Sequence, residues 1–332
     1  MISDSAEPWL PRFTRCHTAV VVGCCGILLF ATAWVAGLPL SLQIVVLAGA
    51  VGLAGLPHGA LDLALLRGAG MRTRAIFGIA IGYVLLSAMV LALFATFPIT
   101  ALAGFLFISW LHFGLGDTEQ MSGVTRGIEA AARGGVIIVA PVFFHPIEVA
   151  RIFQMIAGQD SADSILALVE IICQWMAPIC FALLFVAVIY RVRRAVVSPL
   201  PVERFLHGAS ALEMTLTLVL VAFWPPLMAF LVYFCGIHSV RHLAEIGAAR
   251  YPHDARQAAI WLVKESWPLT VATLLLAAGI GTAMASRFEP DSLFTRLIFQ
   301  GLAALTVPHM AISFWLQARG ESTPGDCFSN PK

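Results

Sequence analysis

Residues 75–97 read AIFGIAIGYVLLSAMVLALFATF and contain no charged side chain. A helix needs about 20 apolar residues to cross the hydrocarbon core of a bilayer, so this stretch predicts a transmembrane helix. Similar apolar runs lie on both sides of it, separated by polar residues, proline or glycine. They cover residues 18–35, 39–66, 99–116, 127–145, 164–190, 205–223, 226–247, 267–285 and 293–317. We therefore predict an all-α transmembrane bundle of about ten spans, with a range of roughly eight to ten.

The composition of the whole chain agrees with a membrane protein. Its 332 residues are 59% hydrophobic and 12% charged, with a mean hydropathy of +0.88, whereas a soluble domain is about 25% charged. The net charge of +1 provides no basic surface for phosphates. Soluble globules, disordered chains and nucleic-acid binders are excluded. An opsin is excluded too, because its retinal needs a buried lysine and neither Lys264 nor Lys332 lies in an apolar run.

The arginines predict the orientation, because basic residues in short loops favour the cytoplasmic side. They cluster at alternate connections, for example Arg72 and Arg74 after the second run and Arg193 and Arg194 after the sixth. We therefore expect both termini in the cytoplasm, as tails of residues 1–16 and 319–332. Residues 17–318 would form one transmembrane catalytic domain in the cell membrane.

Three segments depart from a simple apolar span. Residues 146–158 and 253–265 mix apolar and charged side chains, and we expect them to form interfacial helices. The run 127–145 contains Glu129 and Arg133, so its membrane crossing is expected to start late.

Histidines carry the chemistry that the sequence predicts. Five of the nine lie in or at the ends of apolar runs: His58, His112, His238, His242 and His309. Each belongs to the last part of a helix that runs from outside to inside, so all five are expected at one depth. His238 and His242 are spaced i, i+4 and project from one helix face. Scattered hydrogen-bonded packing residues are the alternative, but a shared depth favours a metal or haem site, since imidazole is a common ligand.

Other side chains near these histidines are candidates to hold them or to line a substrate site. Asp62 follows His58 by four residues, and Asp117 and Glu245 follow two other histidines at similar distances. A ligating histidine commonly donates its second N–H to a carboxylate. Aromatic residues at the same level would form a flat apolar slot, although ordinary core packing would also explain them. They are Trp110, Phe113, Tyr233 and Phe234.

Four short motifs together resemble those of a known family. They are PHGALD at residues 57–62, WLHFG at 110–114, GIHSVRH at 236–242 and PH at 308–309. In this order they are similar to the Brp/Blh family of membrane-embedded microbial β-carotene 15,15'-dioxygenases. The resemblance covers most of the chain. It leaves His309 without a firm role.

The resemblance implies a specific reaction and site. β-Carotene would be cleaved by O2 at its central double bond into two molecules of all-trans-retinal, in contact with membrane lipid. The cofactor would be non-haem Fe(II), bound by His58, His112, His238 and His242, with no catalytic residue beyond the metal centre. An opsin that accepts the retinal is a candidate partner.

Other classes of protein also use intramembrane histidines. A bis-histidine haem protein could carry electrons across the membrane, but it would need haems in both leaflets. A di-iron desaturase needs several histidine boxes, and only one HxxxH is present. A metal or proton transporter needs polar groups along its whole path, which the outer halves of these runs lack.

Overall fold

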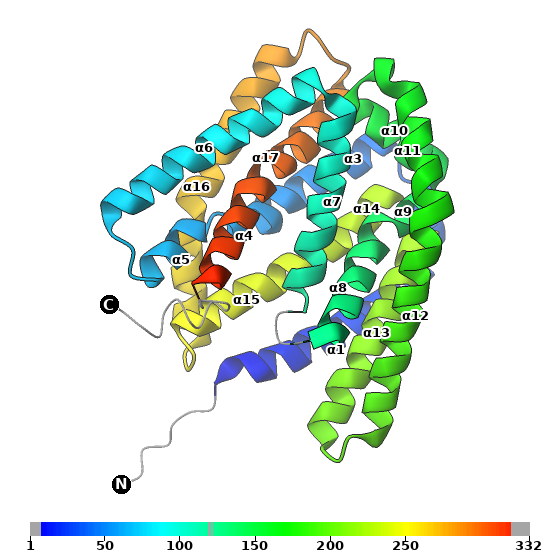
Figure 1. Cartoon of the computed structure of the whole chain (residues 1–332), viewed down its shortest axis with the longest axis vertical. Helices are drawn as coiled ribbons and strands as arrows, with labels where there is room; N and C mark the ends of the chain where they lie inside the picture. The colour runs from blue at the N-terminus through cyan, green and yellow to red at the C-terminus, as the bar shows by residue number, and fades with distance from the viewer. Residues whose placement is uncertain (1–7, 119–120, 122, 320–332) are drawn as a thin grey trace.

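The computed structural model describes residues 8–118, 121 and 123–319, and all regular structure in this part of the chain is helical (Figure 1). The longer helices are α1 (Trp9–Phe30), α3 (Leu40–Ala50), α6 (Thr73–Thr96), α7 (Pro98–Gly116), α8 (Gly123–Ile138), α10 (Pro146–Ala157), α11 (Ala162–Ile171), α12 (Ala177–Val197), α13 (Pro201–Phe223), α15 (Ser239–Arg250), α16 (Ala255–Met284) and α17 (Pro290–Ala318). Shorter pieces join them: α2 (Thr32–Ala36), α4 (Leu56–Gly59), α5 (Asp62–Gly68), α9 (Ala140–Phe144), α14 (Pro226–Leu231), the 3₁₀ turn η2 (Gln159–Ser161) and the π-helical segments η1 (Val51–Gly55), η3 (Ile172–Met176) and η4 (Val232–His238).

Eight helical stretches among the described residues are long and apolar enough to cross a membrane. They are Leu40–Gly68, Thr73–Thr96, Pro98–Gly116, Gln159–Val197, Pro201–Phe223, Pro226–Arg250, Ala255–Met284 and Pro290–Ala318. Each coincides with one of the predicted runs. The remaining two runs, 18–35 and 127–145, correspond to α1 with α2 and to α8 with α9, which are not among these eight. The chain is thus an all-helical, multi-pass membrane protein.

Several segment boundaries differ from the prediction. Helix α1 begins at Trp9 and so extends into the expected tail of residues 1–16; residues 1–7 and 320–332 of the two tails lie outside the described part. The expected interfacial helix 253–265 is instead the first part of α16. Asp254 caps this helix by accepting a hydrogen bond from the backbone N–H of Gln257, and no break follows before Met284.

The two described ends of the chain lie at the same end of the bundle (Figure 1). The indole of Trp9 donates a hydrogen bond to the carbonyl of Tyr251 at 2.7 Å, which fixes the start of α1 beside the turn between α15 and α16. The arginine-rich connection between α12 and α13 lies at that end as well. That this end faces the cytoplasm stays a prediction from the arginines.

Helices α7 and α8 approach each other closely through two glycines. A Cβ on Gly114 would lie 2.1 Å from the carbonyl oxygen of Ala130, and one on Gly134 would lie 2.2 Å from that of Trp110. Only glycine permits such backbone proximity. The indole of Trp110 also donates to the carbonyl of Ala131 at 2.8 Å. The end of α7 is therefore held firmly against α8.

Candidate metal centre

Five histidines from five helical segments meet inside the bundle. His58 comes from α4, His112 from α7, His238 from the end of η4, His242 from α15 and His309 from α17. Each ring centre lies between 4.8 and 6.4 Å from at least three of the other four. The five residues that the sequence singled out thus form one cluster.

The backbone is irregular where the histidines emerge. The π-helical segment η1 ends three residues before His58 and η4 ends at His238, and such segments often mark functional sites. Pro57 and Pro308 each precede a histidine, and a proline inside a membrane helix frees a carbonyl that the bundle must satisfy. The prolines are visible in the sequence, whereas the π turns are not.

Three of the histidines are placed to share a metal ion. Nitrogen atoms of His58, His112 and His238 all lie within 4.8 Å of one another, and all three side chains are buried. The Nε2 atoms of His112 and His238 are only 3.1 Å apart. Imidazole nitrogens suit iron, copper, nickel or zinc, so the donor set fits a transition metal.

His242 adds a further observation in favour of a ligand. Its ring is parallel to that of His238, with an interplanar angle of 3° and 6.4 Å between centroids, as the i, i+4 spacing predicts. Its Nε2 is buried and has no hydrogen-bond partner among the described residues. A buried polar atom without a partner is costly, and a bound metal would satisfy it.

The carboxylates near the cluster accept hydrogen bonds from different histidines than the sequence spacing suggested. Asp117 accepts a hydrogen bond from His238 Nδ1 at 3.0 Å rather than from His112, and its other oxygen accepts one from the hydroxyl of Tyr233 at 2.6 Å. Asp62 accepts from Nδ1 of His309 at 2.7 Å rather than from His58.

Uncharged side chains contact the other two histidines of the trio formed by His58, His112 and His238. The hydroxyl of Ser239 lies 3.3 Å from Nδ1 of His58, and the sulfur of Met310 lies 3.1 Å from Nδ1 of His112. Glu245, the third predicted carboxylate, does not line the cavity beside the cluster.

Asp117, just beyond the end of α7, is held in its ionised form. Burial alone would raise its pKa, but the hydrogen bond from His238 and the charges of Arg133 and Arg241 outweigh burial. The pKa of Asp117 therefore lies well below its ordinary value. A carboxylate in this state is a strong acceptor for the Nδ1–H of His238.

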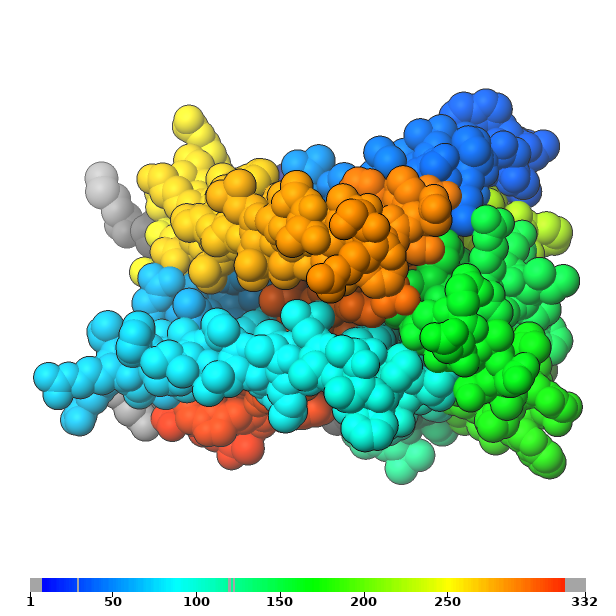
Figure 2. Space-filling view, turned by 90° about the horizontal axis from the view of Figure 1, so that it is seen from above, coloured from blue at the N-terminus to red at the C-terminus, as the bar shows by residue number. Residues whose placement is uncertain are grey.

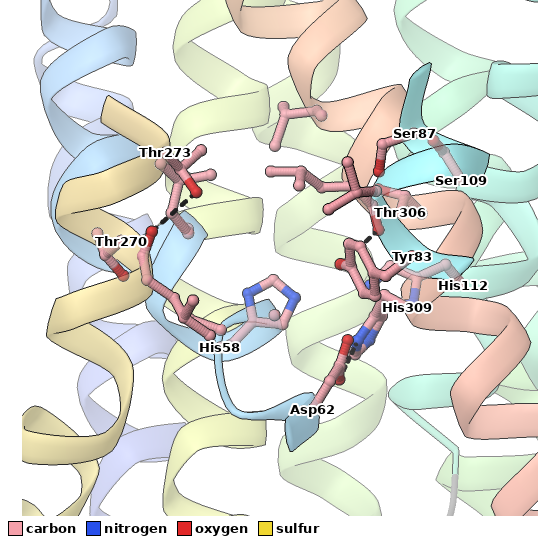
Figure 3. A pocket seen from close by; sticks show the side chains of 18 of the residues that line it. His58, Asp62, Tyr83, Ser87, Ser109, His112, Thr270, Thr273, Thr306 and His309 are labelled. Atoms are coloured by element: carbon pink, nitrogen blue, oxygen red, sulfur yellow. Dashed lines mark hydrogen bonds and ion pairs between the residues drawn. The ribbon is translucent and has the colours of Figure 1, made fainter. Parts of the chain in front are cut away.

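A cavity of about 390 Å³ begins at the cluster, and most of the residues that line it are apolar (Figure 3). His58, His112 and His309 form part of its wall, together with Asp62. Most of the other lining residues belong to α6, α7, α16 and α17, and several of them carry hydroxyls, such as Thr270.

The cavity opens sideways between α6 and α16. Val84 of α6 and Leu276 of α16 both line it, yet their exposed fractions are 67% and 65%. Figure 2 shows these two helices on opposite sides of α17, which is visible between them. Both helices are long and apolar enough to cross a membrane, so this opening would face lipid in a bilayer.

The predicted aromatic residues divide into two groups. Phe113 and Phe234 line the cavity beside the histidines. Trp110 instead packs against α8, where its indole is hydrogen-bonded, and Tyr233 is directed at Asp117. The sequence could not separate the groups, since all four lie within five residues of a histidine.

Comparison with known proteins agrees with this architecture. A sequence profile of the beta-carotene 15,15'-dioxygenase family matches residues 49–317. The chain belongs to this family. The matched region includes all five clustered histidines, and the family consists of oxygenases.

Two curated relatives have similar names. The chain is 29% identical to the "Beta-carotene 15,15'-dioxygenase" of an uncultured marine bacterium, 66A03, over 78% of its own length and 88% of the relative. It is also 29% identical to the "Probable beta-carotene 15,15'-dioxygenase Blh" of Halobacterium salinarum, over 79% and 81% of the two chains. No solved structure matches the chain.

A chain of buried ion pairs supports the helical stretch Pro226–Arg250, which carries two of the clustered histidines. Arg241, between His238 and His242 on α15, binds both carboxylate oxygens of Glu213 on α13. Arg133 of α8 binds Glu213 at 3.0 Å and Glu129 at 2.9 Å. These contacts fix the rotation of α15 about its axis.

The ion pairs continue to α12, where Arg191 binds Glu129 at 2.7 Å. The sequence reveals the charges inside apolar runs but not their partners, because the paired residues lie on different helices.

Proposed function

We propose that this protein is a non-haem iron dioxygenase that cleaves β-carotene at its 15,15' double bond with O2 and releases two molecules of all-trans-retinal. One observation carries the proposal. In a chain of this family, the nitrogens of three buried histidines converge, and two of these residues, His58 and His112, line an apolar cavity that extends between α6 and α16.

The residues present fit the proposed cofactor. Fe(II) would be held by His58, His112, His238 and His242, whose neutral imidazoles leave the charge of the metal uncompensated. Bound Fe(II) supplies a redox-active metal that can react with O2. The ionised Asp117 keeps His238 in the tautomer whose Nε2 faces the other histidines.

The chain itself contributes binding, orientation and exclusion of water. A carotenoid dissolves in the bilayer, so an opening between α6 and α16 would admit it without passage through water. Phe113 and Phe234 offer flat apolar surfaces beside the cluster. No acid or base is required if both aldehyde oxygens come from O2, so we assign no catalytic residue beyond the metal ligands.

The setting of the reaction is part of the proposal. We place the protein in the cell membrane with both termini in the cytoplasm. An opsin that accepts the retinal remains a prediction from the family resemblance.

The decisive experiment uses cells that produce β-carotene. Expression of the chain should bleach their orange colour and yield retinal on chromatography. Alanine at His58, His112, His238 or His242 should abolish both bleaching and bound iron. His253→Ala is the matched control, because His253 lies exposed in the turn between α15 and α16. If the protein is present in the membrane and no bleaching occurs, the proposed activity is wrong.

Isotope labelling tests the use of oxygen separately. With ¹⁸O2 in a brief assay, each retinal molecule should carry one labelled oxygen. If one of the two aldehyde oxygens came from water instead, the reaction would not be a dioxygenation.

A further inference from the structure

His309 is held in the same manner as a proposed ligand. Its Nδ1–H donates to Asp62 at 2.7 Å, just as that of His238 donates to Asp117 at 3.0 Å. All four side chains are almost fully buried. A carboxylate on one ring nitrogen fixes the tautomer and presents the other nitrogen to a metal.

The ring of His309 also lies beside two histidines of the trio, His58 and His112. Its centroid is 5.2 Å from that of His112 and 5.6 Å from that of His58. Within the trio of His58, His112 and His238, the corresponding distances run from 4.8 to 6.0 Å. The ring of His309 is therefore closer to those of His58 and His112 than these two rings are to each other.

In His58, His112, His238 and His309 alike, Nδ1 is the ring nitrogen that contacts a neighbouring side chain. Nδ1 of His58 and His112 lies against Ser239 and Met310, while Nδ1 of His238 and His309 faces a carboxylate. In each ring Nε2 is then the nitrogen through which a metal can be bound. Four helical segments thus contribute similarly oriented imidazoles.

Asp62 provides a second, independent observation. Its Oδ2 is buried and has no hydrogen-bond partner among the described residues, although its Oδ1 is bonded to His309. A buried carboxylate with one unsatisfied oxygen is costly unless positive charge lies nearby. A metal dication bound by His309 would supply that charge.

We infer that His309 is a further ligand of the metal and that Asp62 is its positioning residue. The inference rests on the proposed function, since it requires that the cluster binds iron. It extends the ligand set beyond His58, His112, His238 and His242.

Metal binding by matched variants tests the inference. We would purify wild-type protein, Asp62→Asn and Asp117→Asn in detergent and titrate Fe(II) against a competing chelator. Each substitution keeps the shape of a side chain that holds one histidine. Both should weaken Fe(II) affinity by a similar factor, about 10- to 100-fold.

His309→Ala should weaken Fe(II) affinity further, and free imidazole should restore part of it by entering the vacated space. The absorption spectrum of the Co(II)-substituted protein should also change, because it reports the ligands of the metal. His309→Gln, which is closer in size, guards against a folding defect, and thermal melts monitor both variants.

The outcomes separate the two claims. If Asp62→Asn and His309→Gln bind Fe(II) as tightly as the wild type while Asp117→Asn does not, His309 is not a ligand. If Asp62→Asn lowers only the melting temperature, Asp62 is merely structural and the inference also fails. If the wild-type protein binds no Fe(II), the proposed function itself is wrong.

Discussion

Gly114→Ala should damage the metal centre through the backbone of the neighbouring helix. The added methyl would lie 2.1 Å from the carbonyl oxygen of Ala130, whereas Cβ atoms essentially never approach a heavy atom closer than 3.0 Å. Helices α7 and α8 must therefore separate by about 1 Å. Overpacking of this kind typically costs about 1–3 kcal/mol of stability.

The displacement reaches the proposed ligands because His112 lies two residues before Gly114. Its Nε2 is 3.1 Å from that of His238, so a shift of about 1 Å would spoil a shared coordination geometry. A misplacement of about 1 Å can reduce activity by roughly 100-fold. We expect a similar loss of retinal formation, together with reduced iron content.

Gly104→Ala on the same helix is the matched control. A Cβ at Gly104 would have no heavy atom within 4 Å, and replacement of a mid-helix glycine by alanine favours the helix by about 0.5–1 kcal/mol. The two variants should therefore change the melting temperature in opposite directions. Purified proteins would be compared by thermal melts with a thiol-reactive dye, by metal analysis and by retinal yield.

Equal melting temperatures and iron contents for the two alanine variants would refute this reasoning. A second check is the double variant with Ala130→Gly. It should not rescue Gly114→Ala, because the closest clashes involve the carbonyl group of Ala130 rather than its methyl. Full rescue would show that the side chain, not the backbone, limits the approach.

Three further substitutions probe the ion pairs, the cavity and the support of the cluster. Glu213→Gln leaves the guanidinium of Arg241 without its anion and that of Arg133 with Glu129 alone, and it should destabilise the protein by about 3–5 kcal/mol in a thermal or denaturant melt. The exposed Glu170→Gln should change stability by less than about 0.5 kcal/mol, and equal losses would contradict the idea. Ala88→Phe fills part of the cavity and should lower retinal yield while iron content stays unchanged; an unaltered yield would place the substrate elsewhere. Tyr233→Phe removes a hydrogen bond to Asp117 and should weaken Fe(II) binding by roughly 10-fold; unchanged affinity would show that Asp117 alone suffices.

Hydropathy predicted the positions of the candidate spans well, because every helix that crosses a bilayer needs about 20 apolar residues. The run 75–97, for instance, corresponds to α6 with ends shifted by only one or two residues. The segment 253–265 was assigned wrongly since its charges suggested a membrane surface. In the structure it is continuous with α16, whose first turns extend beyond the apolar part of the helix.

The predicted orientation of the spans and the depth of the histidines in them indicated that the histidines would cluster. They did not indicate which side chains would be hydrogen-bonded to the histidines. Asp62 is four residues after His58, which would place both on one face of an unbroken helix. The helix is interrupted between them, because α4 ends at Gly59 and α5 starts at Asp62. Asp62 is thereby turned toward His309, a contact across 247 positions that no local spacing indicates.

The π-helical segments have a consequence for how such a site can evolve. A π turn holds one residue more than an α turn, so the helix after η4 is rotated relative to the helix before it. Removal of one residue within Val232–His238 would restore a regular helix and swing His238 by about 100° away from the other histidines. A single inserted residue therefore sets how the part of this span that bears His238 and His242 is rotated relative to α14, which precedes it.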